Sequence, residues 1–175
     1  MFSDPVKNIA QSGIIPGMEV ADFGAGSGAL VFAAAKAMLS TGRVYAVDVQ
    51  QELLSKIKNN AVREGIYNVE VILGDIEKPK GSKLRDNFID FVLLSNILFQ
   101  VENKNNVIEE ARRILKPGGA VLVVDWSDSF GNLGPKPESV VTKAVVQDLF
   151  EKLGFHLERE IDAGAHHYGL IFKKL

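Results

Sequence analysis

The chain of 175 residues contains no cysteine, which excludes a disulfide framework, a thiolate zinc site and a cysteine nucleophile. It also lacks an apolar run long enough to span a bilayer, because its strongest candidate, ALVFAAAKAML (29–39), is interrupted by Lys36. The N-terminus, MFSDPVKNIAQSG, lacks the basic and apolar regions of a secretion signal. We therefore expect a cytoplasmic protein with no membrane partner.

An excess of basic residues is also missing. Lysine and arginine together number 20 against 22 aspartates and glutamates, and the formal net charge is −2. A general attraction to nucleic acid or to an anionic surface is not implied by this balance. With 46% apolar residues, the chain has the composition and length of one globular domain, which we expect to span residues 1–175.

Strand-like and helix-like segments alternate from end to end. β-branched and apolar strand patterns occupy 18–24, 43–49, 69–75, 88–98 and 120–126, and helical patterns occupy 29–39, 51–64, 103–115 and 138–154. The segment LKPGG (115–119) stops a helix, turns the chain and starts a strand. Helix-length connections between strands predict a parallel sheet that is covered on both faces.

Two late strand patterns, 156–161 and 167–175, are joined by only five residues, DAGAH (162–166). This connection is too short for a parallel crossover, so the two strands must form an antiparallel hairpin. The sequence thus predicts an α/β protein with a Rossmann-like, doubly wound sheet of seven strands. The sheet is mostly parallel and ends in a C-terminal antiparallel hairpin.

A glycine-rich turn follows the first strand in VADFGAGSGAL (20–30). In open α/β sheets, ligands bind beyond the carboxyl ends of the strands, where this turn lies. Gly24, Gly26 and Ala29 satisfy the relaxed dinucleotide fingerprint, and Asp48 ends the next strand, where a ribose-binding carboxylate is expected. A nicotinamide or flavin cofactor is therefore one hypothesis that these residues leave open.

Asp22 favours a different ligand. It stands two residues before Gly24, and a carboxylate at that place repels a pyrophosphate by on the order of 1 kcal/mol even in bulk water. Asp48, Asp75 and Asp125 also stand at or near predicted strand ends, so we expect four carboxylates on one rim. Such a rim suits a cationic ligand. S-adenosylmethionine has ribose and adenine, but a sulfonium and an ammonium in place of phosphates.

The motifs VADFGAGSG, VYAVDV, LGDI, LLSN and LKPGG, in this order and spacing, resemble those of class I S-adenosylmethionine-dependent methyltransferases. The resemblance covers roughly residues 5 to 175 and is strongest to small methyltransferase-domain proteins related to quinone-biosynthesis C-methyltransferases. It implies S-adenosylmethionine as the cofactor and S-adenosylhomocysteine as the product. We expect no metal, because adjacent histidines point opposite ways on a strand and no metal-ligand spacing appears in the sequence.

The resemblance also implies roles for single residues at the methionine end of the cofactor. The backbone of Gly24, Ala25 and Gly26 would approach the methionine part, and Asp22 would hold the ammonium directly or through water. Ser95 and Asn96 would offer polar contacts near the methionine carboxylate or the transferable methyl. An alternative structural reading has Ser95 and Asn96 capping a short helix at 97–101.

At the adenosine end, the resemblance implies that Asp48 accepts from the ribose hydroxyls and that Val49 packs on adenine. Asp75 would accept from the adenine amino group, and the Ile76 amide would reach a ring nitrogen. A structural alternative is open for Asp75, which could serve as a helix or turn cap. Gly28, just after the turn, could serve only helix–strand packing.

No catalytic residue is required by the chemistry, because methyl transfer is an in-line displacement that positioning alone can accelerate. An acid or base is needed only when the nucleophile must lose a proton. The candidates are His166 and His167 in the terminal hairpin turn, together with Asp125. The alternative is that both histidines are solvated turn residues.

The acceptor is expected to be a small molecule. The fourth strand is followed by LSNILF and not by NPPY, the tetrapeptide of enzymes that methylate amines of DNA bases and glutamine. An RNA or protein acceptor, and a binding module without catalysis, stay open as alternatives. The Gly- and Pro-rich loop 127–139 is a candidate lid over the acceptor. The sequence does not reveal the oligomeric state.

Overall fold

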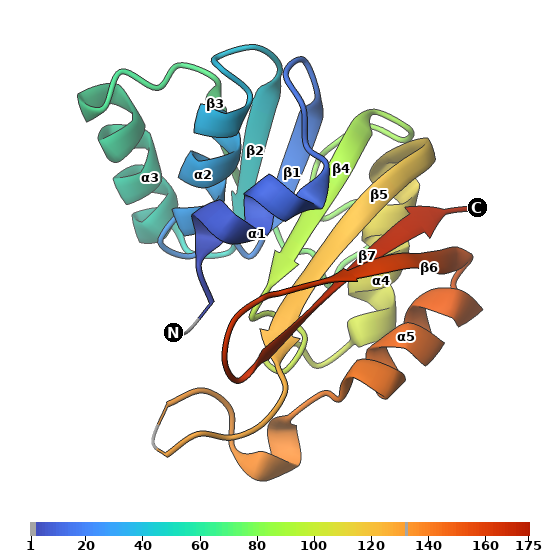
Figure 1. Cartoon of the computed structure of the whole chain (residues 1–175). Coiled ribbons are helices and arrows are strands. Elements are labelled where there is room, and N and C mark those ends of the chain that lie inside the picture. The colour runs from blue at the N-terminus through green and yellow to red at the C-terminus, as the bar shows by residue number, and fades with distance from the viewer. Residues whose placement is uncertain (1–2, 132) are drawn as a thin grey trace.

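The computed structural model describes residues 3–131 and 133–175, which form one twisted sheet with helices on both faces (Figure 1). The helices are α1 (Pro5–Ser12), α2 (Ala29–Ala37), α3 (Gln51–Arg63), α4 (Lys104–Ile114) and α5 (Lys143–Lys152), with a short 3₁₀ turn at Pro137–Ser139. The strands are β1 (Glu19–Phe23), β2 (Arg43–Asp48), β3 (Val69–Leu73), β4 (Ile89–Ser95), β5 (Leu115–Trp126), β6 (Phe155–Ile161) and β7 (His167–Lys174).

The seven strands lie in the order β3-β2-β1-β4-β5-β7-β6, which confirms the expected topology. Strands β1 to β5 pair in parallel, whereas β7 is antiparallel to both β5 and β6. The terminal hairpin is therefore present, and β6 runs in the same direction as β5. The order in which successive strands are added reverses between β1 and β4, which are parallel neighbours, and such sheets bind ligands at this point.

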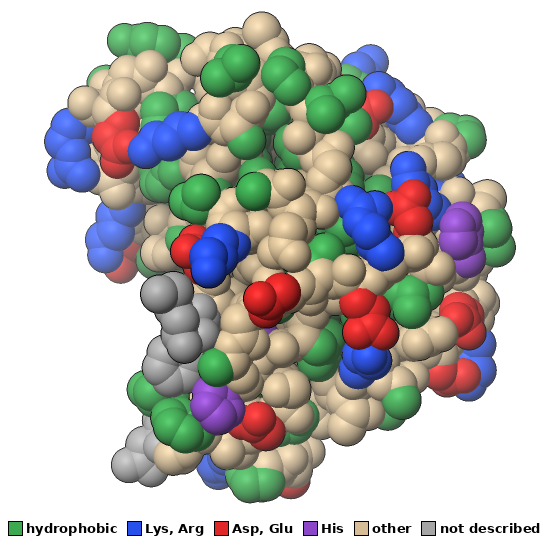
Figure 2. Space-filling view, viewed as in Figure 1, with side chains coloured by type: hydrophobic (Ala, Val, Ile, Leu, Met, Phe, Trp, Pro, Cys, Tyr) green, Lys and Arg blue, Asp and Glu red, His purple; other side chains and the backbone are tan. Residues whose placement is uncertain are grey.

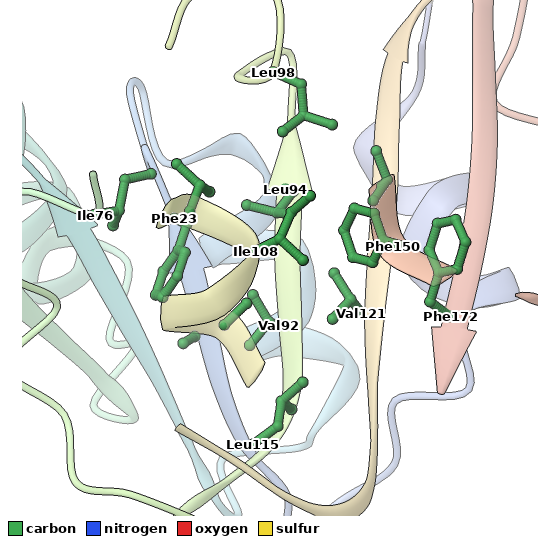
Figure 3. Packing of buried hydrophobic residues seen from close by; sticks show 14 of the residues in the cluster. Phe23, Ile76, Val92, Leu94, Leu98, Ile108, Leu115, Val121, Phe150 and Phe172 are labelled. Atoms are coloured by element: carbon green, nitrogen blue, oxygen red, sulfur yellow. The ribbon is translucent and has the colours of Figure 1, made fainter. Parts of the chain in front are cut away.

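Side chains alternate between two hydrophobic cores along the central strands. On β4, Phe91 and Leu93 join the core under α1, α2 and α3, whereas Val92 and Leu94 join the core under α4 and α5. This alternation follows from the two-residue period of a strand, and both sets are buried because helices cover both faces. In the second core, Phe150 of α5 stacks on Phe172 of β7 with ring centroids 4.2 Å apart (Figure 3).

Three local details differ from the sequence expectations. Strand β5 already begins at Leu115, which pairs with Ile89, and the LKPGG segment is a bulge after which Ala120 pairs with Phe91. The last helix starts at Lys143 and not at 138, because the Thr142 hydroxyl caps it by accepting from the Val145 amide. Strand β3 ends at Leu73, so Asp75 follows the strand by two residues.

Surface charge is mixed. On the face seen in Figure 2, acidic and basic side chains of the described residues are interspersed, without a continuous basic patch. Within 3–131 and 133–175, no helix is long and apolar enough to cross a membrane.

Candidate functional site

A cavity of about 480 Å³ opens at the carboxyl ends of β1, β2, β3 and β4, across the point where the strand order reverses. It is lined by Ser3, Pro5, Asn8, Asp22, Gly24, Ala25, Gly26, Ser27, Ala29, Leu30, Val47, Asp48, Val49, Gln50, Leu53, Gly74, Asp75, Ile76, Glu77, Ser95, Asn96, Ile97, Gln100 and Val101. All ten residues predicted to bind the cofactor are among them. Four lining residues are acidic and, within the described part of the chain, none is Lys, Arg or His.

The glycine turn forms the floor of the cavity. Gly24 has a positive φ of 70°, and a Cβ there would lie 2.5 Å from the Ile97 side chain, so only glycine fits. Gly28 is packed in the same way against Ile57 and begins α2, as its structural alternative predicted. The turn is tight because its backbone passes directly beneath the loop that follows β4.

The amides of this turn are already engaged. Those of Gly24 and Ala25 donate to the Val47 carbonyl, and that of Gly26 donates to Asp48 at 2.9 Å. A phosphate-binding loop needs free N–H groups that point at the anion. Three consecutive amides here point at acceptors within the chain, which disfavours a diphosphate at this turn.

Asp22 lies on β1 with 3% of its surface exposed, and no described residue donates a hydrogen bond to its carboxylate. Burial raises its pKa from an ordinary value of 3.8 to about 8, and the charge of nearby Asp48 contributes to the rise. A buried carboxylate without donors is unfavourable in the empty protein. A cationic ligand with N–H donors would compensate it.

Asp48, at the end of β2, is 7% exposed. One carboxylate oxygen accepts from the Gly26 amide and the other from the Gln50 amide, both at 2.9 Å. The side chain therefore joins the glycine turn to the start of α3. A carboxylate has about four lone-pair sites, so two are left for ligand hydroxyls.

Beside β3, Asp75 has the structural role that its alternative predicted. Its Oδ1 accepts from the Glu77 amide at 3.1 Å, and its Oδ2 lies 3.2 Å from Lys78 Nζ. The Ile76 amide donates to no described residue, and the Val49 side chain is 61% exposed at the cavity. The Asp75 carboxylate thus supplies an acceptor, the Ile76 amide a free donor and Val49 an apolar surface. A planar heterocycle with an amino group can use all three.

Ser95 and Asn96 end β4 at the cavity. The helix considered at 97–101 is absent, and these residues form a turn that begins at Asn96 with a φ of 54°. The Asn96 amide donates to the Val124 carbonyl, but its side-chain Oδ1 is buried without any donor among the described residues. Asn96 thus carries an unpaired, fully buried acceptor beside the cavity.

Residues in α1 and just before it were not predicted to belong to the site. Ser3, Pro5 and Asn8 line the cavity, although they lie before the first strand. A short amphipathic helix gives no sequence signal that one of its polar residues is buried.

Asp125 does not contribute to the rim, so the expected group of four carboxylates is reduced to Asp22, Asp48 and Asp75 at the predicted positions. Asp125 is 1% exposed, and its oxygens accept from the Leu98 and Trp126 amides at 3.0 and 2.8 Å. Burial raises its pKa to about 6, against the lowering effect of these bonds. Its carboxylate fastens the turn after β4 to β5.

The two histidines lie beyond the cavity along the same edge, at the β5–β7 pair, and neither lines it. His166 Nδ1 is 2.8 Å from Asp128 Oδ1, and its ring lies 4.1 Å from that of Phe130. The ring of His167 lies 4.3 Å from Trp126. The structure thus joins the hairpin turn to the loop after β5. The role of this loop as a lid stays a prediction, and Asn132 within it is outside the described residues.

No cluster of three or more His, Cys, Asp or Glu side chains within 3–131 and 133–175 is arranged to hold a metal ion.

Comparison with known proteins places this geometry in context. Residues 14–163 match the family model described as "Methyltransferase domain". The chain is similar to the ubiquinone/menaquinone biosynthesis C-methyltransferase UbiE of Cupriavidus taiwanensis, with 35% identity over 68% of this chain and 47% of that protein. It is also similar to the UbiE of Hydrogenovibrio crunogenus, with 37% identity over 87% of this chain and 65% of the relative. The chain thus spans less than two thirds of either relative.

Among solved structures, an S-adenosylmethionine-dependent methyltransferase from Aquifex aeolicus is similar over almost the whole chain. It superposes with a TM-score of 0.89 at 28% identity, covering 99% of this chain and 91% of that one.

Proposed function

Because the chain belongs to the class I S-adenosylmethionine-dependent methyltransferases, we propose that it methylates a small-molecule acceptor and that residues 1–175 act as a single cofactor-binding domain. The observation that carries the proposal is the buried carboxylate of Asp22, which faces the cavity without a donor. A phosphate cofactor would oppose ionisation of this carboxyl further, whereas a cationic adenosyl donor would favour its ionised form and be held by it.

The cavity residues divide into two ends. Asp22 and the backbone of Gly24, Ala25 and Gly26 would hold the amino-acid part, with Ser95 and Asn96 alongside. Asp48 would accept from the ribose hydroxyls through its remaining lone pairs. This order follows the sheet, from β4 and β1 at the methionine end to β2 beneath the ribose.

Adenine would lie beside β3. Val49 offers an apolar surface to the ring, Asp75 an acceptor to its amino group, and the free Ile76 amide a donor to a ring nitrogen. When bound, S-adenosylmethionine supplies an electrophilic methyl on a sulfonium. The contribution of the chain is to fix the adenosyl and amino-acid ends so that the acceptor approaches along one line.

The acceptor would enter beyond Asn96, towards the end of β5 and the start of β7. Two UbiE relatives at 35% and 37% identity support a flat, electron-rich ring of quinone type, methylated at carbon. The aromatic side chains of Trp126 and Phe130, next to His167 and His166, lie on that side of the sheet and suit such a ring. His166, oriented by Asp128, is the residue best placed to take a proton there.

Transfer of a labelled methyl group tests the proposal. The purified chain is incubated with methyl-labelled S-adenosylmethionine and a reduced, unmethylated quinone precursor, and then with total tRNA and a protein extract. We expect labelled product from the quinone precursor and S-adenosylhomocysteine in equal amount. Asp48→Ala serves as the control and should give none.

Label found only in tRNA or only in protein would mean that the acceptor is that macromolecule and not a small molecule. Intact cofactor binding without transfer to any of them would indicate a binding module. Calorimetric binding of NADH in place of S-adenosylhomocysteine would refute the proposal altogether.

A further inference from the structure

The end of the cavity proposed for adenine is formed by a short turn after β3. Asp75 supplies the acceptor, Ile76 supplies an amide that donates to no described residue, and Glu77 follows them in the cavity wall. The Glu77 amide donates to Asp75 Oδ1 at 3.1 Å, so the three residues form one turn. Selective binding of a heterocycle edge requires its donor and acceptor to be fixed relative to each other by supporting contacts.

Helix α4 supplies such contacts. The half-buried Asn106 side chain, in the first turn of the helix, donates through Nδ2 to the Glu77 carbonyl at 2.8 Å. In return, Glu77 Oε2 accepts from the amide of Asn103, the N-cap residue of α4, at 2.7 Å. The two bonds run in opposite directions between the turn and the helix, so they fix both the backbone and the side chain of Glu77.

Asn106 is itself held in place within α4. Its backbone amide donates to Asn103 Oδ1 at 3.1 Å, which is the cap bond of the helix. The two residues that follow it, Val107 and Ile108, are fully buried in the hydrophobic core that also contains Ile76 (Figure 3). The position of Asn106 is therefore fixed by a cap and by the burial of its neighbours, so its Nδ2 can support the turn in the absence of ligand.

The rest of the loop after β3 is attached to α4 by a different residue. Glu110 accepts from the Lys80 and Ser82 amides, both at 3.0 Å. None of residues 78–85, all of which the structure describes, lines the cavity. Glu110 thus holds the part of the loop that does not line the cavity, whereas the Asn106 side chain holds the part that does.

We propose that Asn106 is a positioning residue for adenine recognition, which fixes the turn so that the Asp75 carboxylate and the Ile76 amide meet the same edge of the base. The inference rests on the proposed function. Adenine presents an amino donor beside a ring-nitrogen acceptor, whereas hypoxanthine presents a carbonyl acceptor beside an N–H donor. A fixed acceptor and donor therefore bind adenine and reject hypoxanthine, because the exchanged edge leaves both protein groups unpaired.

The same helix offers a matched control. Asn105 precedes Asn106 in the first turn, is exposed, and its side chain makes no hydrogen bond to a described residue. Asn105→Ala and Asn106→Ala change the same residue type on the same helix, but only the second removes the bond to the turn. Asn106→Asp keeps the size of the side chain and loses the donor, and an acidic residue is favourable in the first turn of a helix.

The experiment is calorimetric titration of the wild type and these variants with S-adenosylhomocysteine and with S-inosylhomocysteine, its hypoxanthine counterpart. We expect the wild type to prefer the adenine ligand by about tenfold or more. Asn106→Ala and Asn106→Asp should weaken S-adenosylhomocysteine binding about fivefold and leave S-inosylhomocysteine binding within about twofold, so that the preference falls. Asn105→Ala should leave both affinities within about twofold of the wild type.

A full wild-type preference in both Asn106 variants would overturn the inference. An equal loss of affinity for both ligands would also overturn it, because that pattern indicates general support of the cavity wall. If Asn106→Ala does not fold, Asn106→Asp gives the same comparison.

Wild-type binding of S-adenosylhomocysteine without a preference over S-inosylhomocysteine would overturn the inference and leave the proposed function standing. Failure of the wild type to bind S-adenosylhomocysteine would instead refute the proposed function, so the two failures are distinguishable.

Discussion

Asp22 and Glu110 are both buried carboxylates, but their surroundings are opposite. Glu110 of α4 is 2% exposed and accepts five hydrogen bonds, from the Lys80 and Ser82 amides, the Ser82 hydroxyl and two nitrogens of Arg113. Burial alone would raise its pKa, but the bonds from Arg113 and Ser82 outweigh burial and lower it. Asp22 accepts none, and burial raises its pKa to about 8.

The comparison separates a structural carboxylate from a binding one. Glu110 fastens the loop after β3 to α4 with donors of its own chain, so nothing remains for a ligand. Asp22 is left uncompensated at a cavity, which lowers the stability of the empty protein, and we propose that this carboxylate receives the cation of the ligand. Both side chains are buried carboxylates, and the supply of donors distinguishes them.

Glu110→Gln should produce the largest effect on folding. It removes the charge that pairs with the partly buried Arg113, and breaking a buried pair from one side costs about 3–5 kcal/mol. Urea denaturation should show a fall of that order in the free energy of unfolding, while S-adenosylhomocysteine affinity of the folded fraction stays within about threefold. A change below about 1 kcal/mol would mean that Glu110 is not a structural clamp.

Asp22→Asn should change the affinity for the ligand strongly and, unlike Glu110→Gln, should not act mainly on folding. We expect at least a hundredfold loss of S-adenosylhomocysteine affinity, because the buried charge that compensates the ammonium is gone. The stability of the variant relative to the wild type should rise with pH. The wild-type carboxyl is protonated when folded and ionised when unfolded between about 4 and 8, so wild-type stability falls through that window as pH rises. If the free energies of unfolding of the wild type and of Asp22→Asn changed with pH in parallel, the pKa assigned to Asp22 would be contradicted.

A smaller effect is expected from pH on wild-type binding. A cation binds the ionised form of Asp22, so affinity should weaken as pH falls below about 8, by at most about tenfold per unit. Calorimetry in buffers of different ionisation enthalpy should detect one proton released per ligand bound near neutral pH. Asp22→Asn should lose both the slope and the proton release.

Much of the fold was predictable from the sequence, because strand and helix periods differ and the short link at 162–166 requires a hairpin. The positions of Asp22, Asp48 and Asp75 at the cavity followed from the rule that parallel strands end at one edge. Their individual surroundings did not follow. The helical pattern at 103–115 treats Glu109 and Glu110 alike, yet Glu109 is exposed and Glu110 is buried against a loop distant in sequence.

The errors have the same physical origin. Asp125 stands near a strand end as Asp22 does, but the turn after β4 places the Leu98 amide over it and makes it structural. Asn8 is buried only because α1 lies over the glycine turn, a contact between elements that no local pattern encodes. The supply of hydrogen-bond donors is a tertiary property, and it determines which polar side chains at the cavity are paired within the chain and which are not.

The most direct test of the uncompensated Asp22 carboxylate as a cation site is a crystal structure with S-adenosylhomocysteine bound. We predict the ligand ammonium at about 3 Å from the Asp22 carboxylate, directly or through one water, and the ribose hydroxyls at a similar distance from Asp48. An ammonium turned to solvent, with Asp22 still without a donor, would contradict the account.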